Sequence, residues 1–210
     1  MLHILCGPAA AGKDSLLKTL EKRGYIPIIS TTSRPKRVSE TEGVEYKFVT
    51  KEYFEEQMAK GEFAECRKYT AINEKGDYED WYYGCHASDL RAMDPEKDYI
   101  IILDMNGIRE LKKFLGSNKD IIVCYLDAPD TIRRKRAEGR GSFNIDEWSR
   151  RVVDDREQFN QSAILRETDM VLDNSMKYKP EDLAFSMMGL ANDYQERAAA
   201  IKARKTKTVG

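Results

Sequence analysis

A short glycine-rich segment near the start of the chain has the residue types and spacing of a phosphate-binding loop. Gly7, Gly12 and Lys13 fit the pattern GxxxxGK, in which backbone N–H groups turn toward phosphate oxygens and the lysine reaches the β- and γ-phosphates. The apolar residues 2–6 come directly before the loop and a helical pattern follows it, so the positive end of a helix should face the phosphates. A glycine-rich turn without a ligand is the alternative, and the match of all three positions in this context disfavours it. We expect ATP to lie on Gly7, Pro8, Ala9, Ala10, Ala11, Gly12, Lys13, Asp14 and Ser15.

The residue after the lysine departs from the usual pattern. Asp14 stands where Ser or Thr normally binds Mg²⁺, and Ser15 follows it. A carboxylate is a suitable ligand for a hard cation, so an oxygen ligand is kept. Its negative charge would repel the phosphates unless a cation lies between them. We therefore expect Mg²⁺ to enter with ATP and to be held in part by Asp14.

Arginines in the second half of the chain have the chemistry that phosphoryl transfer needs. Transfer depends on in-line positioning and on positive charge around the moving group. Arg136 and Arg140 are four residues apart and can share one helical face, and Arg151 follows a polar, glycine-containing break at residues 139–145. We predict that this break closes as a lid and excludes water. Lys13, Arg136, Arg140 and Arg151 are thus the predicted catalytic residues.

The composition describes an ordinary globular chain with no basic excess. The 210 residues are 41% hydrophobic and carry a formal net charge of -1, so we expect one well-buried core and no nucleic-acid partner. No run of about 18 apolar residues is present and the first residues lack the features of a signal peptide. The four cysteines are scattered without CxxC spacing. We expect a reduced, cytoplasmic location and no membrane contact.

The order of apolar segments favours an α/β fold. Nearly continuous apolar runs at residues 2–6, 26–30, 99–103, 121–126 and 170–172 alternate with helical patterns, which is typical of a parallel sheet covered on both faces. The segment 30–92 is polar and rich in tyrosine, and it holds short strand-like pieces around one amphipathic helix. The predicted division is a core at 1–29, 93–138 and 152–203, an acceptor-binding lobe at 30–92, a lid at 139–151 and a disordered tail at 204–210.

Beyond the loop the sequence resembles the guanylate kinase family over about residues 2–190. The resemblance rests on short motifs in the family's order: STTSRPKR at 30–37, ETEGVEYKF at 40–48, GEFAE at 61–65, YYG at 82–84, DMNG at 104–107 and RAEGRG at 136–141. It implies a three-layer P-loop kinase fold, with a parallel five-stranded core sheet, an inserted nucleoside-monophosphate-binding lobe and a lid. It also implies an ATP-dependent kinase that phosphorylates GMP or dGMP as a monomer or homodimer.

The same resemblance implies roles for residues of the lobe and of the nucleotide site. It places the acceptor phosphate on Ser30, Arg34, Arg37, Tyr46 and Tyr83, which offer forked donors and hydroxyls to a dianion. Glu65 would accept from N1–H and N2–H₂ of guanine and disfavour adenine, whose N1 is an acceptor. The acceptor site is completed by Gly84, Cys85 and Asp104. Asp104 would also help to order Mg²⁺, and the ATP purine would lie near Arg140 and Asn174.

Departures from the family pattern leave alternatives open. Cys85 stands where the family has a Ser or Thr that donates to guanine O6, so a modified or deoxy purine, or more loosely bound GMP, remains open. Ile102 replaces the first aspartate of a D-x-D pair, and residues 73–80 include an insertion that we expect to lengthen a loop at the acceptor pocket. The alternatives from other classes are a ribose 1,5-bisphosphate kinase, which the GKDSLL segment resembles, and a non-enzymatic binding module.

Overall fold

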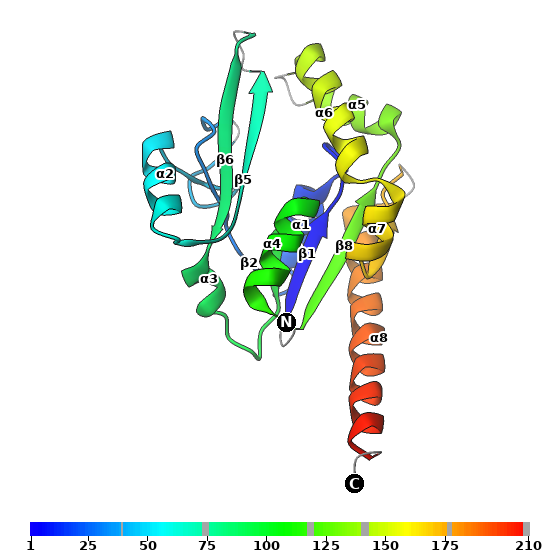
Figure 1. The fold of residues 1–210 in the computed structure, drawn as a ribbon. Coiled ribbons are helices and arrows are strands. Elements are labelled where there is room, and N and C mark those ends of the chain that lie inside the picture. Colours follow the sequence, from blue (N-terminus) through cyan, green and yellow to red (C-terminus); the bar gives the residue numbers. More distant parts are fainter. Residues whose placement is uncertain (39, 73–75, 117–119, 140–142, 176–177, 208–210) are drawn as a thin grey trace.

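A parallel five-stranded sheet forms the core, as the apolar runs predict (Figure 1). The computed structural model describes residues 1–207 except 39, 73–75, 117–119, 140–142 and 176–177, and side chains as far as residue 196. In sheet order the strands are β2 (Ile26–Pro27), β7 (Tyr99–Ile102), β1 (Leu2–Cys6), β8 (Ile121–Asp127) and β9 (Met170–Asp173). All neighbours are parallel. β2 is shorter than the predicted strand at 26–30, although the Ile28 N–H still donates to Ile100 O at 2.8 Å.

Helices cover both faces of this sheet and bury two apolar clusters against it. On one face lie α3 (Ala87–Arg91), α4 (Met105–Leu115) and α7 (Gln161–Glu167), and on the other α1 (Lys13–Glu21) and α8 (Pro180–Lys207). Two further helices, α5 (Asp130–Glu138) and α6 (Ile145–Gln158), follow β8 in the chain. This three-layer arrangement places the loop after β1 at the carboxyl end of the sheet, where α/β folds bind their ligands.

The segment 30–92 forms a separate lobe with its own four-stranded sheet (Figure 1). Its strands are, in order, β4 (Lys47–Phe48), β3 (Thr31–Thr32), β6 (Tyr78–His86) and β5 (Phe63–Ile72), and one helix, α2 (Lys51–Ala59), packs on them. Thr50 caps this helix by accepting from the Tyr53 N–H, and Phe54 is its buried contact. The predicted inserted lobe is therefore present as a distinct layer beside the core.

Residues 78–80 of the predicted loop insertion at 73–80 belong to strand β6 instead. β5 and β6 pair in antiparallel register as far as Ile72 and Tyr78, and residues 73–75 lie outside the described part of the chain. At this far end the Ile72 N–H donates to Glu147 Oε2 of α6 at 2.9 Å. In Figure 1 the hairpin and α6 lie on the same side of the molecule. The far end of β5 thus joins the lobe to α6.

The two ends of the predicted lid and the tail need correction. Residues 145–151 are the first half of α6, which begins because Asn144 accepts from the N–H groups of Asp146 and Glu147. Gly139 ends α5, and residues 140–142, with the predicted catalytic Arg140, lie outside the described residues. The prediction of a disordered tail is wrong for 204–207, which continue α8. Over the described residues, no helix has the length and apolar character needed to cross a bilayer.

Candidate active site

The loop after β1 has the conformation of a phosphate cradle. Gly7 and Gly12 adopt positive φ angles of 141° and 104°. A Cβ at position 7 would lie 2.3 Å from Leu126 O, so this close approach of backbone requires glycine. Lys13 Nζ donates to Gly7 O at 2.7 Å and to Pro8 O at 2.9 Å, which holds the ammonium group over the loop. The lysine is therefore held at the loop, and its contact with the β- and γ-phosphates stays a prediction.

A buried ion pair that the sequence analysis missed braces this loop. Asp155 Oδ2 accepts from the Ala9 N–H and from Arg133 Nη1, both at 2.9 Å, and Arg133 Nη1 also donates to Ala9 O at 3.0 Å. Arg133 is only 3% exposed. Burial raises the pKa of Asp155 despite the opposing effects of Ala9, Lys13 and Arg133. We infer that Arg133 and Asp155 position the loop.

Arg136 and Asn174 complete the support of the loop. Arg136 Nη1 donates to Ala11 O at 3.1 Å, and its Nη2 donates to Asn174 O at 3.0 Å. The Asn174 side chain donates to the same Ala11 carbonyl at 2.7 Å. Asn174 therefore contacts the phosphate loop, and its place beside the ATP purine stays a prediction. Arg136 lies at the loop, where a catalytic arginine is expected.

Arginines from two parts of the chain converge on the predicted acceptor-phosphate site. Arg34 is 4% exposed and donates to Glu40 Oε1 at 2.7 Å, while Glu40 Oε2 accepts from the Arg37 backbone N–H at 2.8 Å. Burial and the positive charges of Arg34 and Arg151 lower the pKa of the Arg37 guanidinium. Two positive neighbours around a third guanidinium make a strong site for a dianion.

The remaining predicted phosphate ligands line the same part of the lobe. The rings of Tyr46 and Tyr83 meet edge to face with centroids 5.7 Å apart, and the Arg34 guanidinium lies 5.6 Å from the Tyr46 centroid. Ser30 is buried just before β3, and its carbonyl accepts from the Lys47 N–H. Burial raises the pKa of Tyr46, and the charges of Tyr83 and Asp14 add to that rise.

Glu147 holds the predicted catalytic Arg151 and the end of the β5–β6 hairpin at the same time. Its Oε1 accepts from Arg151 Nε at 2.6 Å, and Arg150 Nε donates to Oε2 at 2.8 Å. The Ile72 N–H also donates to Oε2. Burial alone would raise the pKa of Glu147, but Arg150, the Ile72 N–H and Arg151 outweigh it and lower the pKa to about 2. One carboxylate thus links α6 to the acceptor lobe.

Replacing this carboxylate should weaken folding in a pH-dependent way. Because the pKa of Glu147 is lowered from 4.5 to about 2 on folding, its ionised form stabilises the native state above pH 4.5, and this stabilisation is lost as pH falls toward 2. We expect Glu147→Gln to reduce the free energy of unfolding by about 2 kcal/mol at pH 7. Urea unfolding of both proteins between pH 7 and pH 3 should show this difference shrinking below pH 4.5. A difference that stays constant with pH would contradict the assignment.

The predicted base-recognition residues meet between β5, β6 and the start of α4. Glu65 is 2% exposed and lies opposite Cys85 in the β5–β6 register. Burial raises the pKa of the Cys85 thiol to about 12, so it is a neutral group, and its Sγ lies 3.7 Å from His86 O. Gly84 has a packing role, because a Cβ there would lie 2.8 Å from a Phe63 ring carbon.

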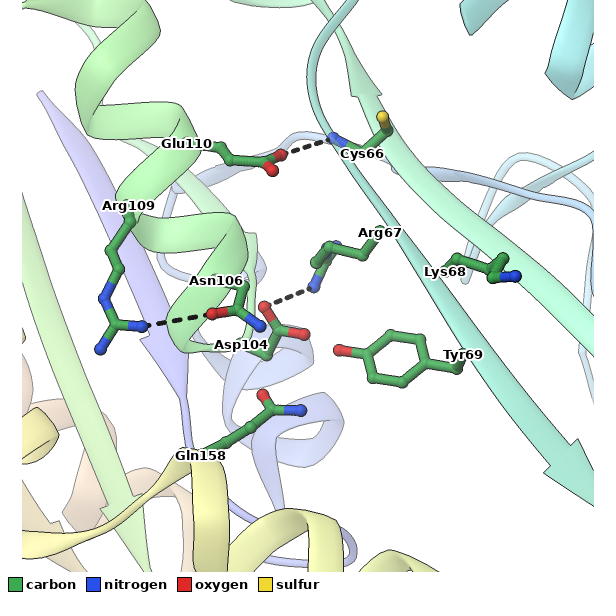
Figure 2. Close-up of a pocket in the computed structure, with 9 residues that line it drawn as sticks. All are labelled: Cys66, Arg67, Lys68, Tyr69, Asp104, Asn106, Arg109, Glu110 and Gln158. Atoms are coloured by element: carbon green, nitrogen blue, oxygen red, sulfur yellow. Dashed lines mark hydrogen bonds and ion pairs between the residues drawn. The ribbon is translucent and has the colours of Figure 1, made fainter.

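Asp104 lies at the start of α4 beside Arg67 of β5. It caps α4, with Oδ1 accepting from the Gly107 N–H at 2.7 Å, and the same oxygen lies 3.4 Å from Arg67 Nη1 (Figure 2). Asp14 is exposed in the first turn of α1. Within the described part of the chain, no three or more His, Cys, Asp or Glu side chains are grouped to hold a metal ion. A cation bound with ATP would therefore take most of its ligands from phosphate and water.

Comparison with known proteins identifies similar chains. The sequence profile described as guanylate kinase matches residues 1–179. The guanylate kinase of Hydrogenovibrio crunogenus is 30% identical over 168 residues, which cover 76% of this chain and 76% of that protein. The guanylate kinase of Symbiobacterium thermophilum is 29% identical over 100% of this chain and 88% of its own length. In structure, guanylate kinase from Anaplasma phagocytophilum superposes with a TM-score of 0.62 at 17% identity, covering 93% of this chain and 86% of that one.

Proposed function

This chain belongs to the guanylate kinase family, and we propose that it transfers the γ-phosphoryl group of ATP to GMP with the residues described above. The observation that carries the proposal is the position of the arginine-lined acceptor site beside the phosphate loop. Lys18 of α1 pairs with Glu45 of the lobe at 2.8 Å, which joins the helix that follows the phosphate loop to the lobe. Donor and acceptor phosphates bound at these places would be close enough for direct transfer.

The residues support transfer without a strong general base. The acceptor phosphate is already an anionic nucleophile, so the chain has to orient it and to neutralise charge. Arg34 and Arg37 would bind the acceptor phosphate, and Lys13 the β- and γ-phosphates of ATP. Arg136 and Arg151 would approach the transferring group from α5 and α6. The contact of the β5–β6 hairpin with Glu147 supports a closed lobe that excludes water.

Mg²⁺ fits this site as a partner of ATP. When bound it would neutralise charge on the β- and γ-phosphate oxygens. The exposed carboxylate of Asp14 directly follows Lys13, so it is the candidate ligand from the loop. Asp104 is proposed to act on the acceptor, because one of its oxygens is already engaged by the Gly107 N–H and Arg67.

Asp14→Ser restores the usual residue of a phosphate loop, yet it should lower activity. Ile102 stands where the family pattern has an aspartate. If the Asp14 carboxylate takes over the role of that aspartate, its removal weakens the binding of the cation. We expect kcat to fall about 10-fold and the Mg²⁺ concentration for half-maximal activity to rise. ADP release measured over a Mg²⁺ titration gives both kcat and the Mg²⁺ concentration for half-maximal activity. The control is Asp94→Ser, which removes an exposed carboxylate. An unchanged or higher kcat would disprove the idea.

The test of the function is ADP release with ATP and Mg²⁺ against GMP, dGMP, AMP, CMP, UMP and ribose 1,5-bisphosphate. Turnover confined to GMP and dGMP is expected. Turnover on the sugar bisphosphate alone would contradict guanine recognition by Glu65, and no turnover on any acceptor would favour a binding module. The preference between GMP and dGMP, the cytoplasmic location and the state as monomer or homodimer stay predictions.

A further inference from the structure

An arginine is ion-paired with the two carboxylates that the proposed function assigns to the acceptor nucleotide. Arg67 follows Glu65 by two positions on β5, so both side chains leave the same face of the strand. Arg67 Nε lies 2.8 Å from Glu65 Oε2, and its Nη2 lies 3.4 Å from Oε1. Its Nη1 lies 3.4 Å from Asp104 Oδ1, and a dashed line marks this ion pair in Figure 2. The Glu65 side chain is fully buried and that of Arg67 is 11% exposed, so this is an interior ion pair.

The first turn of α4 is shaped to receive the guanidinium. A Cβ at position 107 would lie 3.1 Å from Arg67 Nε and 3.2 Å from its Cδ and Cζ. The glycine of the DMNG motif therefore leaves room for a group packed flat against the helix start. Burial alone would lower the pKa of Arg67, but Glu65 and Asp104 outweigh it and raise the pKa, so the group is a permanent cation here.

The guanidinium presents the same donors as the guanine edge. Guanine offers N1–H and an N2 amino group on one side of a planar N–C–N unit, and an arginine offers Nε–H and Nη–H in the same arrangement. One buried carboxylate can accept only one such forked pair at a time. We propose that Arg67 is an internal competitor of the substrate, and that guanine reaches Glu65 only by displacing it. This inference rests on the proposed function.

A neighbouring cavity can receive the displaced side chain. A cavity of about 450 Å³ adjoins the ion pair, and Arg67 itself is part of its wall. Glu110 of α4 lines the same cavity (Figure 2), where its carboxylate accepts from the Cys66 N–H at 3.0 Å. A turn of the Arg67 side chain toward Glu110 and Asn106 would keep the cation near oxygen acceptors. The Arg67 side chain thus has one position paired with Glu65 and space for a second position in the cavity.

Competition of this kind raises the KM for the acceptor and leaves the chemical step unchanged. A base must offer two donors to compensate for the lost ion pair, and adenine offers an acceptor at its N1. Arg67 therefore weakens the binding of GMP and rejects bases that cannot replace its bonds. Its effect differs from that of a residue that binds substrate, because its removal should strengthen acceptor binding.

The test compares wild type, Arg67→Ala and a matched control, Arg134→Ala, which removes an exposed arginine paired with Glu138. We expect Arg67→Ala to lower the KM for GMP at least 10-fold, with kcat and the KM for ATP within 2-fold. The control should change none of these values. An unchanged or higher KM for GMP in an active Arg67→Ala enzyme would overturn the inference and leave the proposed function intact. Turnover of GMP by Arg67→Ala but not by wild type would also support competition.

Absence of GMP turnover in both wild type and a folded Arg67→Ala protein would instead reject the proposed function, and the inference with it. A crystal structure of wild type with GMP decides the question even if the variant does not fold. We expect Arg67 to have left Glu65 and to lie in the adjoining cavity. Arg67 still paired with Glu65 beside a bound guanine would overturn the inference.

Discussion

Replacing Lys13 with methionine should lower kcat about 10³-fold, because it removes a cation positioned at the phosphates that exchange the phosphoryl group. Its ammonium group is held by two loop carbonyls, Gly7 O at 2.7 Å and Pro8 O at 2.9 Å. The lysine is therefore organised before ATP binds, and little reorganisation is needed at the moment of transfer. Methionine keeps most of the side-chain length and removes only the charge and its donors.

ADP release at saturating ATP and GMP measures this loss, and thermal unfolding shows whether the variant folds. The matched control is Lys22→Met, which removes an exposed lysine just after the same helix and should retain kcat within 2-fold. A loss of less than 10-fold in a folded Lys13→Met protein would show that this lysine is not the main cation at the transferring group.

The parts of the fold that were predictable are those with local signals. The strands of the core are buried on both faces, so their residues form nearly continuous apolar runs, and the phosphate loop is one uninterrupted segment. The start of α6 also has a signal in the sequence, because Asn144 followed by Glu147 is typical of a helix N-terminus. The glycine-rich residues before it led to the prediction of a lid that runs to residue 151.

The parts that were not predictable depend on contacts between distant segments. Arg133 and Asp155 lie on different helices, and nothing in the sequence pairs them with the Ala9 backbone. The β5–β6 extension is polar and rich in turn-forming residues, so its composition favours a loop over a strand. Arg67 had a signal, because side chains two apart on a strand share a face, but only the structure reveals that it lies on the Glu65 carboxylate.

Arg37→Ala should lower kcat/KM for GMP about 10²-fold without weakening the fold. An arginine that donates charge-assisted hydrogen bonds to a phosphate dianion contributes about 2–3 kcal/mol, which corresponds to this factor. Before GMP binds, the charged form of Arg37 is electrostatically unfavourable, because burial and the charges of Arg34 and Arg151 lower its pKa. An acceptor phosphate bound here would offset this cost by supplying negative charge beside Arg37.

The stability of the variant separates this role from a structural one. Removing the Arg37 side chain takes away a half-exposed ion pair with Glu40 at 3.6 Å, but Glu40 keeps its Arg34 partner at 2.7 Å and its bond from the backbone N–H at position 37. We therefore expect the free energy of unfolding without ligand to change by less than about 0.5 kcal/mol. Arg34→Ala is the comparison, since it leaves Glu40 without its buried partner and should cost about 3 kcal/mol as well as activity. Urea unfolding and GMP kinetics on both variants measure the contrast, and a destabilised Arg37→Ala protein would mean that this arginine serves the lobe rather than the phosphate.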